Sequence, residues 1–217
     1  MVFASDRVGT SAVFRAAITN AGSETLLLRT PRMGAFPVDW SADGKYVFAA
    51  GDDLEARPRR LLKIPVDGGS PEEIVTGAQN SLIMPRVSPE GDRIAFTSAE
   101  SGTPADLYVM SISDRRRVRV STMGASNPVW GPNGSELFYQ SSRGELMRAV
   151  LSGTSVSGSP QVMFRPCENI GRTYSPAVTE WNYDVSADGT RFLVICDSPD
   201  SIPSALNVIV NWQSKLK

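Results

Sequence analysis

Short runs in which apolar and polar residues alternate make up most of the chain, and turns rich in Gly, Pro, Asp and Ser separate them. A period of two predicts β-strands with one face turned to a core. One arrangement, an apolar run followed by a tight turn and an alternating run, occurs four times. Its copies cover residues 36–48, 84–96, 127–139 and 183–194, so the chain is built from a repeat.

Each copy turns at a glycine, and the four glycines are Gly44, Gly91, Gly134 and Gly189. The intervals between them are 47, 43 and 55 residues. An Asp, Glu or Asn immediately precedes each glycine, where its side chain can hydrogen-bond the backbone ahead of it. Glycine adopts the left-handed conformation without a Cβ clash. We therefore expect tight β-hairpins with three-residue loops and a left-handed glycine.

Two further β-rich runs follow the hairpin in each complete copy, so that a copy consists of four short strands. Such a unit cannot bury both of its faces alone, and radial stacking in a β-propeller covers them. A β-sandwich with coincidental turns is the alternative, but four matching hairpins favour the propeller. A six-bladed ring at this period needs roughly 270 residues. We therefore predict an all-β propeller of four-stranded blades, about four and a half to five of them, forming an incomplete six-bladed ring.

The predicted propeller is a single domain, residues 1–217. No hairpin of the repeated type precedes its first strands, and no fourth strand follows the predicted strand at 206–212. Open strand edges invite pairing with other chains, so we expect self-association through the incomplete blades. The predicted units are a partial blade 1–34, blades 35–80, 81–125 and 126–172, and a partial blade 173–217.

Composition excludes several classes of protein. The formal net charge is −1, whereas a nucleic-acid binder normally carries a basic face. No apolar run approaches the roughly 18 residues of a membrane span. The N-terminus lacks a signal peptide, because Asp6 and Arg7 follow its first few residues directly. The chain is therefore either cytoplasmic or begins away from its natural start, and the compartment of a longer parent, periplasmic or otherwise extracytoplasmic, stays open.

The two cysteines, Cys167 and Cys196, are too few to build a metal site by themselves. Cys196 ends an apolar strand, and we interpret it as a buried thiol that packs as a small hydrophobe. A disulfide bond with Cys167 remains open, because no spacing argument supports it.

The absence of histidine limits the possible chemistry. Nucleophilic mechanisms of the Ser-His-Asp or Cys-His type lack their general base, and zinc sites built on histidine are excluded. Neither a phosphate-binding glycine loop nor a dinucleotide-binding pattern appears. The carboxylates of the hairpins are spread one per copy and are explained by the turns. We therefore expect no enzyme activity, no cofactor and no metal.

The repeated pattern places a proline and a tryptophan ahead of a Ser-x-Asp-Gly turn, and an apolar strand follows the turn. This pattern resembles the repeat of TolB-like propellers, relatives of WD repeats. The resemblance covers essentially the whole chain and is closest at residues 37–48. The third copy has Gly131 and Asn133 in place of Ser and Asp, and the fourth lacks the proline and tryptophan. The ending at 207–212 resembles the last strand of propellers attached to bacterial serine/threonine kinases.

This resemblance implies a non-catalytic interaction or sensor module, the C-terminal portion of a larger bacterial protein. The alternative is the propeller of a prolyl-oligopeptidase-like hydrolase whose catalytic domain is absent. Function concentrates in loops on one face of a rigid scaffold. We therefore expect a protein partner, not nucleic acid, to bind the face that is formed by the loops before each first strand and after each second strand. Arg115, Arg116 and Arg117 lie in another loop and read as a solubilising turn. The expected partner-binding residues are Arg7, Arg32, Arg57, Arg59, Asn80, Asn127, Glu180 and Trp181.

Overall fold

A computed structural model describes residues 1–20, 22–29, 33–53, 60–75, 83–99, 104–166 and 183–196. These residues form antiparallel strands joined by turns, and no helix occurs among them. The alternation of apolar and polar residues therefore folds as predicted, into strands. None of the described segments is a helix long and apolar enough to span a bilayer.

The strands pair into five separate sheets, each in sequence order apart from the branched fourth sheet. The first sheet contains β1 Val2–Ser5, β2 Ala12–Arg15 and β3 Thr25–Leu28. The second contains β4 Met33–Trp40, β5 Tyr46–Asp53, β6 Arg60–Pro65 and β7 Glu72–Val75. The third contains β8 Ile83–Val87, β9 Arg93–Ser98, β10 Asp106–Ser111 and β11 Arg117–Arg119. The fourth contains β12 Ala125–Trp130, β13 Glu136–Ser141, β14 Leu146–Ser152, β15 Ser155–Val156 and β16 Gln161–Phe164. The fifth contains β17 Tyr183–Val185 and β18 Phe192–Val194.

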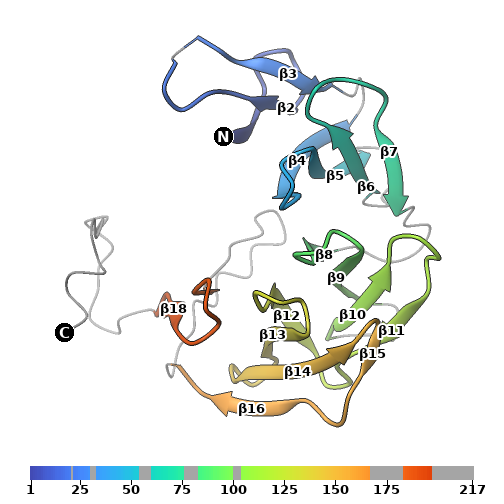
Figure 1. Cartoon of the computed structure of the whole chain (residues 1–217), viewed down its shortest axis with the longest axis vertical. Coiled ribbons are helices and arrows are strands. Elements are labelled where there is room, and N and C mark those ends of the chain that lie inside the picture. The colour runs from blue at the N-terminus through green and yellow to red at the C-terminus, as the bar shows by residue number, and fades with distance from the viewer. Residues whose placement is uncertain are drawn as a thin grey trace.

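The sheets follow one another around an arc (Figure 1). The first strand of each complete sheet lies toward the centre and the last lies on the rim, as β8 and β11 show (Figure 1). The described ends of the arc are the three-stranded β1–β2–β3 sheet and the two-stranded β17–β18 sheet. Radial four-stranded antiparallel sheets are the blades of a β-propeller, so the predicted fold class is confirmed.

The core lies between neighbouring sheets. The second strand of each of the three middle sheets sends alternate side chains to opposite neighbours, as the pleat requires. In β5, Val47 and Ala49 pack toward the first sheet, whereas Phe48 packs against the third. In β13, Leu137 packs toward the third sheet and Phe138 toward the fifth. These strands are buried on both faces, so each sheet depends on its neighbours for its core.

The repeated hairpin has a four-residue loop, where we expected three residues. Ser41 N–H donates to Tyr46 O at 2.9 Å, but Tyr46 N–H donates to the Ser41 hydroxyl at 2.9 Å. Tyr46 N–H therefore bonds the serine side chain, whereas in a shorter loop the equivalent N–H would bond a main-chain carbonyl oxygen. Gly44 has φ +74°, so the prediction of a left-handed glycine is confirmed. The same serine bonding recurs at Ser88 and Ser186.

The interpretation of Cys196 as a buried thiol is wrong. Cys196 is exposed and disulfide-bonded. It lies just beyond the short strand β18, whose own residues are at most half-buried. The other cysteine of the chain, Cys167, lies outside the described residues.

Arg93 connects the third and fourth sheets. Its side chain is largely buried, with the whole residue 8% exposed, and its guanidinium donates to Glu90 at 3.0 Å and to Asp92 at 3.1 Å. It also donates to Gly153 O in the fourth sheet at 2.9 Å, and its Cζ lies 5.0 Å from the ring centroid of Trp130. One cation thus links a hairpin to the neighbouring sheet.

We predict that Arg93→Met lowers the free energy of unfolding by about 1–3 kcal/mol, because charge-assisted hydrogen bonds to partly buried groups are lost. Arg191→Met is the matched control, since Arg191 occupies the same position of the last hairpin but is about half exposed. Urea titration monitored by circular dichroism measures both variants. Equal losses would contradict the linking role of Arg93.

A second prediction concerns the stability of the protein at acidic pH. The Ser186 hydroxyl and the Thr190 N–H hold the pKa of Asp188 well below its usual range. The Ser41 hydroxyl and the Lys45 N–H likewise lower the pKa of Asp43. Because the folded-state pKa is the lower one, each carboxylate contributes stability at pH values above the unfolded-state pKa of 3.8. That stability is lost as the pH falls from 3.8 through the folded-state pKa.

The double variant Asp43→Asn with Asp188→Asn should therefore lose less stability between pH 5 and pH 2 than the unchanged chain. Asparagine can take over these bonds, because Asn133 at the equivalent position of the fourth sheet accepts from the Ser135 hydroxyl at 2.8 Å and from Ser135 N–H at 3.2 Å. Denaturant titrations across that pH range provide the measurement. Identical pH dependence in both proteins would exclude these carboxylates as its source.

Candidate functional site

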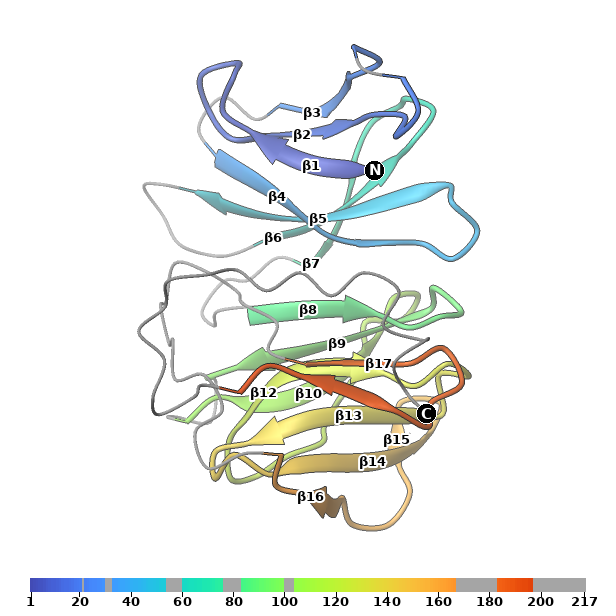
Figure 2. The same cartoon turned by 90° about the vertical axis from the view of Figure 1, so that its left-hand side faces the viewer.

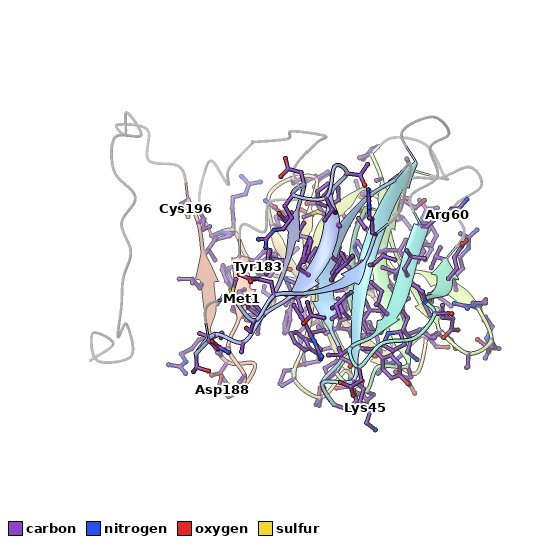
Figure 3. The ribbon with its side chains drawn as sticks, turned by 90° about the horizontal axis from the view of Figure 1, so that it is seen from above. Met1, Lys45, Arg60, Tyr183, Asp188 and Cys196 are labelled. Atoms are coloured by element: carbon purple, nitrogen blue, oxygen red, sulfur yellow. The ribbon has the colours of Figure 1, made fainter. Side chains whose placement is uncertain are left out.

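An open pocket of about 260 Å³ lies where the inner strands reach their hairpins. The side view shows the β4–β5, β8–β9 and β17–β18 hairpins at the same edge of the arc (Figure 2). Seen from above, Lys45 and Asp188 from two of these hairpins lie at that edge, and Arg60 and Cys196 lie toward the opposite edge (Figure 3). The pocket is lined by Asp39, Trp40, Ala42, Arg86, Val87, Ser88, Pro89, Val129, Trp130 and Asp184.

Four of the lining residues occupy the same position of the repeat. This position lies two residues before each hairpin turn begins. Asp39 occupies it in β4, Arg86 in β8, Val129 in β12 and Asp184 in β17. Inner strands of a propeller converge on the axis, so positions far apart in sequence meet there. Two carboxylates, one guanidinium and one apolar side chain share this pocket.

Asp39 also joins two sheets. Its Oδ2 accepts from Val87 N–H of the third sheet at 2.9 Å, and its Oδ1 accepts from Trp40 N–H at 2.9 Å. Burial raises the pKa of Asp39 above its usual value, although these hydrogen bonds and the positive charge of Arg86 act in the opposite direction. Asp184 is exposed, and within the described part of the chain its carboxylate accepts from Val185 N–H at 2.9 Å.

Two tryptophans form apolar walls of the pocket. Trp130 is 9% exposed, and its Nε1–H donates to Arg86 O at 3.0 Å, which ties the fourth sheet to the third. Trp40 is 39% exposed. Beside the pocket, the buried Tyr183 donates its hydroxyl hydrogen to Asn127 O at 2.6 Å. Burial raises the pKa of Tyr183 well above its usual value.

Most of the expected partner-binding residues lie outside the described residues: Arg32, Arg57, Arg59, Asn80, Glu180 and Trp181. Arg7 lies in the β1–β2 connection, where its Cζ is 4.9 Å from the Phe14 ring centroid and 5.4 Å from that of Phe3. Asn127 is 5% exposed, and it has a left-handed backbone, φ +52°, in the bulge of β12.

Sequence reasoning missed the pocket residues, although a signal was present. Aligning the repeats places Asp, Arg, Val and Asp at one position of the inner strand, where a sheet core would favour apolar residues. The triple-arginine turn is also more structured than we expected. Arg115 donates to Ile74 O and Glu73 O at the rim of the second sheet, and Arg116 pairs with Asp114 at 3.8 Å.

The pocket offers carboxylates, a guanidinium and indole rings, which are groups that bind and orient a ligand. Across the described parts of the chain, no three His, Cys, Asp or Glu side chains gather to hold a metal ion. The arrangement is suited to recognising a polar or charged group that enters from the hairpin side.

The fold and the repeated hairpin define the chain as a β-propeller. No protein-family model matches it. A TolB homolog of Chlorobium luteolum is 33% identical over 114 residues, which are 47% of this chain and 26% of that protein. A Tol-Pal system protein TolB of Francisella tularensis is 24% identical over 137 residues, 61% of this chain and 31% of that protein. The matched part therefore spans about a third or less of these relatives.

Solved structures show the same fold. TolB from Acinetobacter baumannii superposes with a TM-score of 0.65 at 19% identity, covering 92% of this chain and 47% of that one. A puromycin-hydrolyzing peptidase of Mycobacterium tuberculosis gives a TM-score of 0.60 at 22% identity, covering 82% and 31%. The relatives in sequence are TolB proteins and the neighbours in structure share the propeller fold, so the resemblance to TolB-like propellers that the repeated motif indicated is confirmed.

We predict that Asp39→Ala lowers the free energy of unfolding by about 1–3 kcal/mol, because the partly buried Val87 N–H loses its acceptor. Asp39→Asn, which keeps one acceptor oxygen and removes the charge, should lose less. Asp184→Ala is the matched control from the equivalent position of β17, and we expect a change within about 0.5 kcal/mol. Denaturant titration at neutral pH measures all three variants. A loss for Asp184→Ala as large as that for Asp39→Ala would refute the proposed link between the sheets.

Proposed function

We propose that this chain is a non-catalytic, TolB-like propeller module that binds a protein partner. The observation that carries the proposal is the pocket at the hairpin edge of the inner strands, lined by charged side chains on a rigid β scaffold. Binding residues held by such a scaffold are suited to recognition, because little ordering is needed when a partner docks. Some of the relatives are named as proteins of a Tol-Pal system, which supports a role in protein–protein contact.

A second candidate function rests on the peptidase neighbours. The puromycin-hydrolyzing peptidase and a prolyl endopeptidase share the propeller fold with this chain. In this reading the chain is the propeller of a hydrolase whose catalytic domain lies elsewhere in a longer protein. The gene sequence that flanks these residues distinguishes the two, since a hydrolase domain on the same polypeptide would favour this reading.

Partner binding can be tested with a random-peptide phage library selected on the purified chain. We expect selected peptides to compete with one another for one site. Ala42→Trp should weaken their binding about tenfold or more, because an indole at this exposed pocket-lining position occupies the space of a ligand. Ala187→Trp is the matched control, since Ala187 holds the same place in the β17–β18 hairpin and does not line the pocket.

The double variant Arg57→Ala with Arg59→Ala tests the face expected from the sequence, formed by the loops before each first strand and after each second strand. If it abolishes binding and Ala42→Trp does not, the partner docks on the face first expected from the sequence. Failure to select any specifically bound peptide, with a correctly folded chain on the support, would count against the module as a peptide- or protein-binding device.

A further inference from the structure

The charges that line the pocket do not balance. Asp39 and Asp184 each carry a carboxylate, and Arg86 is the single cation among the lining residues. The described structure contains no salt bridge to Asp39 or to Asp184 within 4.0 Å. Two carboxylates that face one open volume raise the free energy of the empty pocket, and a cation that enters it relieves that repulsion.

The walls of the pocket suit a long aliphatic stem. Trp40, Val129 and Pro89 line it, and Trp40 is partly exposed. Lysine and arginine bury their methylene groups along apolar surface while the charged head reaches polar groups. The protein already contains a cation–π contact of a basic side chain with the equivalent tryptophan, because the Arg93 guanidinium lies over Trp130, at the repeat position that Trp40 occupies in β4.

We propose that this pocket binds a basic side chain, arginine or lysine, of the protein partner, with its head group between Asp39 and Asp184. The inference rests on the proposed partner-binding function and names the chemistry that the partner presents. Asp184 is the more accessible contact, since it is exposed and accepts one hydrogen bond from its own neighbour. Arg86 opposes a second cation and thereby limits the affinity.

The test uses N-acetyl-arginine amide and N-acetyl-lysine amide as probes, with N-acetyl-citrulline amide as the neutral analogue of arginine. NMR titration follows the indole N–H signals of the full-length chain, assigned with Trp40→Phe and Trp130→Phe variants. We expect both cationic probes to shift the Trp40 signal with saturation, and citrulline amide to leave it unchanged at the same concentrations.

Variants give the sharper result. Asp184→Asn should weaken binding of the arginine probe about two- to fivefold, the size expected for one solvent-accessible ion pair. Arg86→Gln should strengthen binding by a similar factor, because the competing positive charge is removed. Asp67→Asn is the control, since Asp67 is an exposed aspartate in the β6–β7 turn outside the pocket. Denaturant titration confirms that each variant is folded.

Equal shifts with citrulline amide, or arginine binding that Asp184→Asn and Asp67→Asn change to the same extent, would overturn the basic-side-chain site. Phage-selected peptides that lack arginine and lysine, and that the arginine probe does not displace, would also overturn it while leaving partner binding intact. The two proposals therefore fail separately.

Discussion

The structure depends on the fact that a β-sheet in this chain cannot bury its own faces. Strand β9 is buried along its whole length, yet Ile94 and Phe96 belong to the core shared with the second sheet and Ala95 to the core shared with the fourth. A middle sheet therefore depends on both of its neighbours to cover its faces. The radial order of the sheets follows from this need for mutual cover.

Polar bonds near the axis set how neighbouring sheets meet. The Asp39 carboxylate accepts from Val87 N–H, the Trp130 indole donates to Arg86 O, and the Tyr183 hydroxyl donates to Asn127 O. Apolar packing alone is non-directional, so it tolerates sliding between layers. Three bonds of different chemistry, one at each successive junction, define the relative positions of the inner strands and therefore the shape of the pocket between them.

The same repeat position has different roles in different sheets. Asp39 uses its carboxylate to join two sheets, whereas the exposed Asp184 in the equivalent place accepts, among the described residues, from its own neighbour Val185. Val129 has no polar role there and packs in the core that holds Phe138. A position that is not needed for a bond between sheets in every copy of the repeat can carry different side chains from copy to copy, and this explains how an arc of similar sheets has an asymmetric pocket.

The sequence by itself determined the local structure: the strands from their period of two, the hairpins from Ser-x-Asp-Gly and its variants, and the propeller class from four copies that each need neighbours. These features depend on residues close together in the chain, where turn chemistry and side-chain alternation act directly. Only the tertiary structure decided that Asp39, Arg86 and Asp184 share one pocket, that Asn127 is buried, and that Arg93 connects two sheets. Those outcomes depend on contacts between residues tens of positions apart, and such contacts exist only once the sheets have packed around a common axis.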